Sequence, residues 1–478
     1  MGHHEAGKRI QGVKGSIPPE AGLESSNLIY VLKRWLSMAG LMGMVLLLWP
    51  VSVCPEPLST VFSLEESIQL AFKESPTLKI AREAILVAEL KKKQTQTGFL
   101  PKLSAQYSYT YIDKIQTITL PAQDYGLFRT VESTLTAGSQ NNYAFYLTLD
   151  QPIFTGLALT RTYELAGLGL DVSRIKFDQE KIFLAYKVKE AYWNILRSRK
   201  IREVAQQAVL QISDHVRVAK EFYEVGLIPL NDLLKSEVQL ADAKQNLIRA
   251  ENGILLARAN FNTLLRISLE RETEVQDILT FQPFPNSLET CQAEALQKRP
   301  EIKEIETQIE MARKNIQLAQ SEYYPQVVLQ GRYIKQGDTP SVSGSPYVKS
   351  DNWDVAAAMK WNFWDWGRTR YLVQEKTLQG EQVKETFTQV KDLIRLEVKE
   401  AFLSLREAEK NIALAEKTIQ QAEENFRISQ VRYREQATTS LEVLDAQTLL
   451  AQAKNNLYQA LYAYNLAQSR LQRAMGGW

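Results

Sequence analysis

The sequence predicts a mainly α-helical protein with a β part, in which a long helical coiled coil accompanies four β-strands per chain in an internal twofold repeat. Three observations predict this fold class. The chain aligns with itself, two very long segments lack proline, and two pairs of short segments alternate apolar and polar residues. We expect structural repeat 1 over residues 63–285 and structural repeat 2 over residues 287–478.

Residues 1–54 have the composition of a secretory signal region. Lys33 and Arg34 precede an apolar run over residues 38–53, which is the order of a basic segment and an apolar segment in such signals. A start codon assigned too early explains the unusually long stretch ahead of the run. A membrane anchor is the alternative, but the run is short and contains Pro50.

The two cysteines do not predict a disulfide or a zinc site. Cys54 is a candidate lipidation site, although Val53 stands where a small residue is expected. A disulfide to Cys291 is disfavoured because Cys54 is either removed with the signal or modified. His215 stands alone in a helical segment and is expected on the surface, so we expect no metal site and no cofactor.

The charge balance argues against a nucleic-acid partner. The chain carries 57 basic and 55 acidic side chains, and residues 1–54 hold five basic groups and three acidic groups. Removal of that region leaves 52 of each, since 57 − 5 = 52 and 55 − 3 = 52. A chain with no net charge has no general field to attract polyanions.

The internal repeat appears at two constant offsets. Residues 63–111 align without gaps with residues 287–335, so that Pro76 matches Pro300 at an offset of 224. Further along the chain the offset is 210, as between Tyr223 and Tyr433. The change of 14 indicates an insertion between about residues 112 and 142, and insertions are tolerated best in exposed loops.

Each repeat opens with helices and continues with a β-hairpin. In repeat 1, Pro76 separates two helical segments, and Pro101 ends the second one. Strict alternation then predicts hairpins over about residues 102–151 and 326–363, each strand with one apolar face and one polar face. The apolar positions of the first strand are Leu103, Ala105, Tyr107, Tyr109 and Tyr111.

The remainder of each repeat is expected to be helical. Residues 157–223 and 367–433 contain no proline, and each segment would span roughly 100 Å at about 1.5 Å per residue. The helices that follow, over residues 229–267 and 440–475, carry a 3–4 repeat of small and large residues typical of a coiled coil. The second of these seams reads Val443, Ala446, Leu450, Ala453, Leu457, Ala460, Tyr464, Ala467, Leu471, Ala474.

The alternating strands look like the wall of a membrane barrel. Beyond the signal region no long apolar run remains, so a membrane-spanning part would have to be a closed barrel. Four strands are too few to close one, since about eight are needed. The wall would therefore be shared between subunits, and three chains would contribute twelve strands. Two soluble hairpins packed on helices are the alternative.

With these features the chain resembles the TolC family of outer-membrane efflux and secretion channels. The resemblance covers nearly all of residues 62–475 and includes the twofold repeat and the order of elements. Its local motifs are QPIFTG at residues 151–156, NFWDWG at residues 362–367, and the turns within residues 223–234 and 433–444. The order and spacing of these motifs carry the resemblance, because each motif alone is weak.

The resemblance implies a homotrimer with a twelve-stranded β-barrel in outer-membrane lipid and an α-helical barrel that projects into the periplasm. A periplasmic adaptor protein would meet the helical tips and couple the channel to an inner-membrane pump, as in tripartite efflux pumps and type I secretion systems. The channel itself would be a passive duct and not an enzyme.

The resemblance also assigns roles to residues at the tips. It implies Asp232 and Tyr433 as gate partners, with Thr438 where related channels have a gate arginine. It implies an acidic entrance ring of Glu442 and Asp445, whose spacing of three places them on one helix face. Solvated carboxylates at a helix N-terminus are the alternative for this pair. The expected adaptor contacts are Gly226, Leu227, Gln436 and Ala437.

Two departures from the family pattern concern these tips. Thr438 removes a charge pair with Asp232, so the closed state would rest on hydrogen bonds or another pair. Gln436 stands where the first tip has Gly226, which predicts a different turn geometry at the second tip.

Two other functional classes compete with the channel. A soluble periplasmic coiled-coil scaffold or adaptor would suit the helices, but an adaptor should show a small β-barrel domain between its helices, and none is evident. An enzyme would need a nucleophile with its base or a cluster of metal ligands, and the sequence shows neither.

Overall fold

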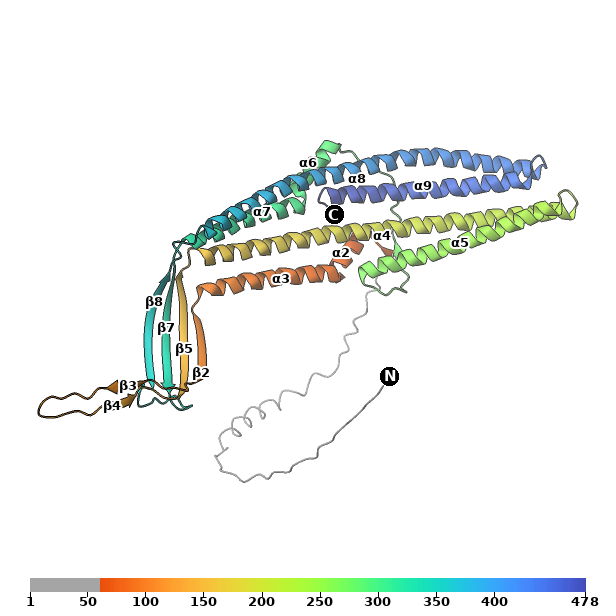
Figure 1. The fold of residues 1–478 in the computed structure, drawn as a ribbon. Helices are drawn as coiled ribbons and strands as arrows, with labels where there is room; N and C mark the ends of the chain where they lie inside the picture. The colour runs from red at the N-terminus through yellow and green to blue at the C-terminus, as the bar shows by residue number, and fades with distance from the viewer. Residues whose placement is uncertain (1–60) are drawn as a thin grey trace, which may run out of the picture. The chain divides into compact units, whose positions relative to one another are not determined.

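The computed structural model describes residues 61–478 and shows a mainly helical protein with a smaller β part (Figure 1). The predicted fold class is therefore confirmed at the level of one chain. The helices are α2 (Leu64–Glu74), α3 (Pro76–Gln96), α4 (Ala158–Glu224), α5 (Leu230–Leu265), α6 (Leu288–Lys298), α7 (Pro300–Gln320), α8 (Arg368–Arg434) and α9 (Ser440–Ala474). The strands are β1 (Val61–Phe62), β2 (Lys102–Tyr111), β3 (Thr117–Leu120), β4 (Ser133–Thr136), β5 (Asn141–Phe154), β6 (Glu274–Val275), β7 (Gln326–Gly337) and β8 (Asp351–Lys360).

The elements recur along the chain at the two offsets found in the sequence. The first offset separates the start of α6 from that of α2, since 288 − 64 = 224, and the start of β7 from that of β2, since 326 − 102 = 224. Helices α4 and α8 are both 67 residues long, and the second offset separates their starts, since 368 − 158 = 210. This correspondence of bounds gives each residue of one repeat a structural counterpart in the other.

Helices α4 and α8 run the full length of the helical part, and shorter helices flank them (Figure 1). Near the sheet α3 packs on α4, while α7 packs on both α4 and α8. Farther from the sheet α5 packs on α4, and α9 packs on both α8 and α4. The contacts of α4 with α7 and α9 thus join the two repeats.

The predicted seams are the buried edges of α5 and α9. In α9 every seam position except Leu457 is buried, and Tyr464 and Leu471 are completely enclosed. In α5 the equivalent seam runs from Leu233 to Leu264, and most of its positions are buried. Leu264 itself is only partly buried, while its neighbour Leu265 is enclosed. Alternation of alanine with larger residues lets the helices approach closely.

None of the helices among residues 61–478 is both long and apolar enough to cross a membrane.

A cluster of charges joins four helices near the middle of the helical part. Arg299, between α6 and α7, pairs with Glu301 at 2.6 Å and with Glu397 of α8, and Arg473 of α9 pairs with Glu397 at 2.9 Å. Burial is the largest single influence and would raise the pKa of Glu397, but the hydrogen bonds and charges of Arg299 and Arg473 together outweigh it and lower that pKa. The cluster therefore holds its charged form and ties the end of α9 to α8.

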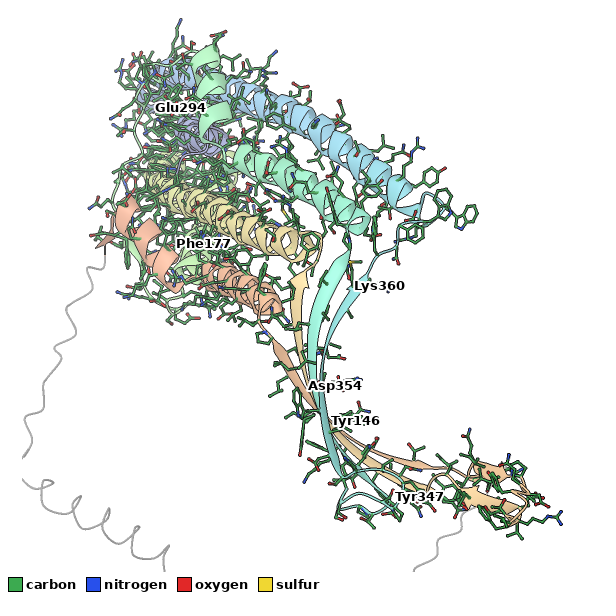
Figure 2. The ribbon with its side chains drawn as sticks, turned by 90° about the vertical axis from the view of Figure 1, so that its left-hand side faces the viewer. Tyr146, Phe177, Glu294, Tyr347, Asp354 and Lys360 are labelled. Atoms are coloured by element: carbon green, nitrogen blue, oxygen red, sulfur yellow. The ribbon has the colours of Figure 1, made fainter. Side chains whose placement is uncertain are left out.

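The long strands form one antiparallel sheet in the order β2-β5-β7-β8. The pairing of β5 with β7 joins the hairpins of the two repeats, and β2 and β8 are the free edges. In Figure 2, Tyr146 and Asp354 lie within this sheet, and Lys360 lies at its end nearest the helices.

The strand register places the apolar residues of all four strands on one face. Leu147 lies opposite Ala105 on β2 and opposite Tyr333 on β7, and Tyr333 in turn lies opposite Trp353 on β8. The other face is polar, with a hydrogen bond of 2.7 Å from Gln330 to Asp150 and an ion pair of 3.1 Å between Arg332 and Asp354. Most large side chains of the apolar face are exposed in the single chain.

The structure differs from the expected hairpins in three places. Strand β5 continues beyond residue 151 to Phe154, because residues of β7 pair with it there across a bulge. Strand β8 ends at Lys360 rather than at residue 363, because residues 361–363 have no neighbouring strand in the single chain. The insertion expected between about residues 112 and 142 contains a small hairpin of its own, β3 with β4.

Candidate functional site at the helical tips

The two turns at the helical tips have the same backbone geometry, so the prediction of different turns was wrong. Gly226 and Gln436 both adopt left-handed conformations, with φ of 76° and 58°. In each turn the next amide donates to a carbonyl five residues earlier, Leu227 to Phe222 at 2.8 Å and Ala437 to Arg432 at 2.7 Å. This pattern is the Schellman termination, in which a left-handed residue lets the last carbonyls of the helix find donors.

The residues expected to contact an adaptor are all exposed. Leu227 is 50% exposed, and the preceding Val225 is 69% exposed. At the second tip the counterparts are Ala437 and Glu435, so that tip is smaller and more polar. A Cβ added to Gly226 would meet no atom within 4 Å, so this position is open to a partner.

The structure does not join Asp232 to Tyr433, the two expected gate partners. Tyr433 is buried and packs its ring against His215 and Phe222 of α4, at centroid distances of 4.7 Å and 5.5 Å. Its hydroxyl makes no hydrogen bond of good geometry among residues 61–478. Burial and, to a smaller extent, the charge of Asp232 raise its pKa, while the nearby Ser440 lowers it by less. Asp232 instead lies 3.8 Å from Lys235 of its own helix.

Thr438 and the acidic residues meet at the start of α9. The Thr438 hydroxyl donates to Glu442, and Arg432 approaches the other oxygen of Glu442 at 3.4 Å. Arg432 therefore supplies a positive charge at this tip, from the last turn of α8 rather than from the position of Thr438. Asp445 is exposed on the same helix face as Glu442 and makes no ion pair among the described residues.

A buried polar chain that no sequence pattern indicated links both tips. His215 was expected on the surface, but it is only 7% exposed. Its Nε2 lies 2.7 Å from the hydroxyl of Ser440 on α9, which lies 2.8 Å from the hydroxyl of Ser236 on α5. Ser236 donates to the carbonyl of Asp232 at 2.9 Å. Ser236 occupies a small-residue position of the coiled-coil seam, which is a weak signal of a packed interface, but no local pattern relates it to His215.

Burial lowers the pKa of His215 to about 4, so the imidazole is neutral at neutral pH. A neutral imidazole can accept one hydrogen bond and donate another, which suits a hydroxyl partner. The chain of hydrogen bonds thus connects α4, α9 and α5 without a buried charge.

The candidate lipidation site Cys54 lies outside the described residues. The other cysteine, Cys291, is completely buried in the core beside α8, and burial raises the pKa of its thiol. No group of three or more potential metal ligands occurs within residues 61–478.

Comparison with known proteins decides the family. The sequence profile described as "Outer membrane efflux protein" matches residues 67–265 and 292–477, one segment in each repeat. The chain belongs to the outer membrane efflux protein family. The resemblance seen in the sequence is therefore confirmed, and the chain is an outer-membrane channel protein that extends into the periplasm. The soluble scaffold or adaptor is not favoured, and the family is one of channels rather than enzymes.

Individual relatives of this efflux protein are distant in sequence. It is 23% identical over 309 residues to outer membrane protein TolC of Vibrio cholerae, covering 61% of this chain and 67% of that protein. It is 22% identical over 309 residues to the pyoverdine export outer membrane protein OpmQ of Pseudomonas putida, covering 64% of this chain and 65% of that protein. The matched part thus spans about two thirds of the length of each of these relatives.

The fold is also that of a solved channel. The crystal structure of the CmeC outer membrane channel of Campylobacter jejuni superposes with a TM-score of 0.71 at 16% identity, covering 87% of this chain and 85% of that chain. This likeness supports the fold of the repeats and of the sheet between them.

Proposed function

We propose that this protein is the passive outer-membrane duct of a tripartite efflux pump or a type I secretion system. It acts as a homotrimer whose twelve strands close a barrel and whose helices line a periplasmic conduit. The observation that carries this proposal is the sheet β2-β5-β7-β8, with one continuous apolar face and two unpaired edges. Such edges cannot remain open in lipid, where each unpaired backbone group costs several kcal/mol.

Aromatic side chains support a position of the sheet in the membrane. Trp361, Phe363, Trp364 and Trp366 are exposed where β8 leads into α8, at the end of the sheet nearest the helices. Tryptophan is enriched at the boundary between lipid and water, because its ring is apolar and its N–H is polar. This end of the sheet would lie at the periplasmic surface of the outer membrane.

The tips of α4–α5 and α8–α9 are the proposed gate and adaptor-binding end. Asp232, Tyr433 and Thr438 belong to the gate, and Glu442 and Asp445 form the entrance ring. Adaptor and pump would open the closed tips, since the channel supplies no energy of its own. The exposed Val225 and Leu227 make the first tip the more apolar docking point.

The test is the native mass of the detergent-extracted particle after separation of inner and outer membranes. We expect an outer-membrane particle of three chains that requires detergent for extraction. A soluble monomer would mean that the apolar face is not barrel wall, and the duct would have to be abandoned.

A further inference from the structure

We infer that the contacts that join the two repeats within one chain recur between chains, so that α8 and β8 of one copy pair with α5 and β2 of the next copy in a register set by the offsets of 210 and 224. This inference rests on the trimer proposed above. It adds which residues meet, and it follows from the internal repeat together with two unequal grooves.

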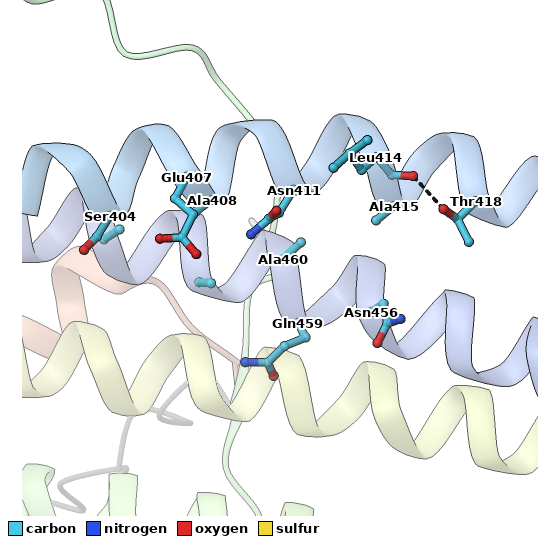
Figure 3. A pocket seen from close by; sticks show the side chains of 12 residues that line it. Ser404, Glu407, Ala408, Asn411, Leu414, Ala415, Thr418, Asn456, Gln459 and Ala460 are labelled. Carbon is cyan, nitrogen blue, oxygen red and sulfur yellow. Dashed lines mark hydrogen bonds between the residues drawn. The ribbon is translucent and has the colours of Figure 1, made fainter.

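The two grooves occupy equivalent places in the two repeats. One groove of about 550 Å³ lies between α4 and α5, where Val204 and Arg249 are among its lining residues. Residues 447, 448, 451 and 455 of α9 form a third wall there. The equivalent groove, of about 540 Å³, lies between α8 and α9 and is lined by Leu414 and Gln459 at the same repeat positions (Figure 3).

The second groove has no third wall in the single chain. All of its lining residues come from α8 and α9 themselves. Leu414 is 65% exposed there, whereas its counterpart Val204 is buried. The residues of α5 that are equivalent to this α9 wall lie 210 positions earlier in the chain. They are residues 237, 238, 241 and 245, and they include the exposed Val238. An α5 helix from a second copy is therefore the occupant that fits.

The charges at equivalent positions are complementary. Within one chain, Arg197 of α4 donates to Gln459 of α9 at 3.2 Å. The counterpart of Arg197 is Glu407 on α8, and the counterpart of Gln459 is Arg249 on α5. Neither Glu407 nor Arg249 makes an ion pair within residues 61–478, and the side-chain hydrogen bond of Arg249 there goes to Asn246, at 3.4 Å. Between copies they would form an ion pair.

The strand register extends in the same way across the free edges of the sheet. Within one chain Leu149 of β5 lies opposite Gly331 of β7. The counterpart of Leu149 is Met359 of β8, at the offset of 210, and the counterpart of Gly331 is Tyr107 of β2, at the offset of 224. The same pairing between copies therefore places Met359 opposite Tyr107 of the next copy. Ala357 then lies opposite Tyr109, so apolar residues face apolar residues along the new pair. A slip by one residue would bring apolar against polar faces.

This register also accounts for the early end of β8. Residues 151–154 are strand in β5 because β7 pairs with them, while β2 reaches only as far as Asp150. Their counterparts are residues 361–364, which lack that neighbour in the single chain. The two sites bind their own repeats in the same way, since the side chains of Gln151 and Trp361 donate to the equivalent carbonyls of Phe99 and Tyr323, both at 3.1 Å. Pairing with β2 of the next copy would make residues 361–364 strand.

The equivalence ends at Trp366. Its counterpart Gly156 packs so closely that an added Cβ would lie 2.5 Å from the carbonyl oxygen of Ser321. The tryptophan cannot make the same contact with Thr97 of the next copy. The inferred register is therefore limited to β8 and residues 361–364.

The first test is a disulfide across the inferred strand pair. Met359→Cys with Tyr107→Cys should give covalently linked chains in oxidised outer membranes, seen on non-reducing gels. A bond within one chain is excluded because β2 and β8 are separated by three strand spacings, roughly 14 Å, beyond the reach of a disulfide. The controls are each single variant and Met359→Cys with Tyr109→Cys, displaced by two residues on the same face.

The second test is a charge exchange at the helical contact. Glu407→Arg alone should lower the yield of assembled trimer, and Glu407→Arg with Arg249→Glu should restore it. If Met359→Cys cross-linked with Tyr109→Cys rather than with Tyr107→Cys, the inferred register would be wrong, although the proposed duct would stand. The same holds if the double exchange did not restore the yield of trimer. Monomers from the unmodified chain would overturn both.

Discussion

Gln436 holds a backbone conformation that favours glycine. Its φ of 58° matches the 76° of Gly226, and both residues end a 67-residue helix with the same hydrogen bonds. The sequence difference suggested two kinds of turn, but the bonding needs of the last helical carbonyls are the same at both tips. The hydrogen bonding of these carbonyls therefore determines the turn, and Gln436 adopts a left-handed backbone conformation that is strained for a residue with a side chain.

The two positions make a matched pair for a stability measurement. Gln436→Gly relieves about 1–2 kcal/mol of left-handed strain and loses about 0.5–1 kcal/mol through the freedom of glycine in the unfolded chain. We expect a net local gain of about 0.5–1 kcal/mol, seen as two- to fivefold slower hydrogen exchange of the Ala437 amide. Gly226→Gln should speed exchange of the Leu227 amide. Unchanged exchange in both variants would mean that the strain is relaxed elsewhere.

At the scale of elements, the first tip differs from the second in the side chains that it exposes. Val225 and Leu227 project from the α4–α5 turn, while Glu435 and Ala437 occupy the same places in the α8–α9 turn. Identical backbones therefore present different surfaces. The apolar tip is the better docking point, since burial of an exposed leucine contributes roughly 1.5–3 kcal/mol.

This difference predicts unequal effects of a charge at each tip. Leu227→Glu should abolish co-purification of the periplasmic adaptor with the detergent-extracted trimer, because a charge would be buried in the contact. Ala437→Glu should weaken it less. Leu127→Glu, at an exposed residue between β3 and β4 far from the tips, is the control for general effects of charge (Figure 1). Equal binding by all three variants would place the adaptor elsewhere on the channel.

At the scale of the whole molecule, three copies would bring the start of α9 together around one axis. Each copy would contribute Glu442, held by Thr438 and Arg432, and Asp445, which has no ion pair among the described residues. The two carboxylates are therefore not equivalent, because Arg432 offsets part of the charge of Glu442. A ring of uncompensated carboxylates attracts cations at a constriction.

We expect Asp445→Asn to lower the cation selectivity of the reconstituted channel more than Glu442→Gln does. The measurement is the reversal potential across a planar bilayer in a salt gradient. Arg432→Gln should increase cation selectivity, since it frees Glu442, and this opposite sign serves as the control. If none of the three substitutions changed the reversal potential, these residues would not line the pore.

The sequence by itself determined the features that depend on near neighbours along the chain. Pro76 and Pro101 limit the first helices, the 3–4 seam identifies the buried edge of α9, and alternation identifies the apolar face of each strand. These signals survive in one sequence because helix and strand periods are local. The repeat made them stronger, since each pattern occurs twice.

Only the tertiary structure decided the features that depend on partners distant in sequence. His215 is buried because Ser440 and Tyr433, which belong to the other repeat, close over it, and no local pattern announces such a contact. Strand β8 stops at Lys360 because its next neighbour is not in the same chain. The pairing of Arg432 with Glu442 likewise follows from the way the turn returns α9 along α8. Periodicity states which face of an element is buried, whereas packing determines what lies against it.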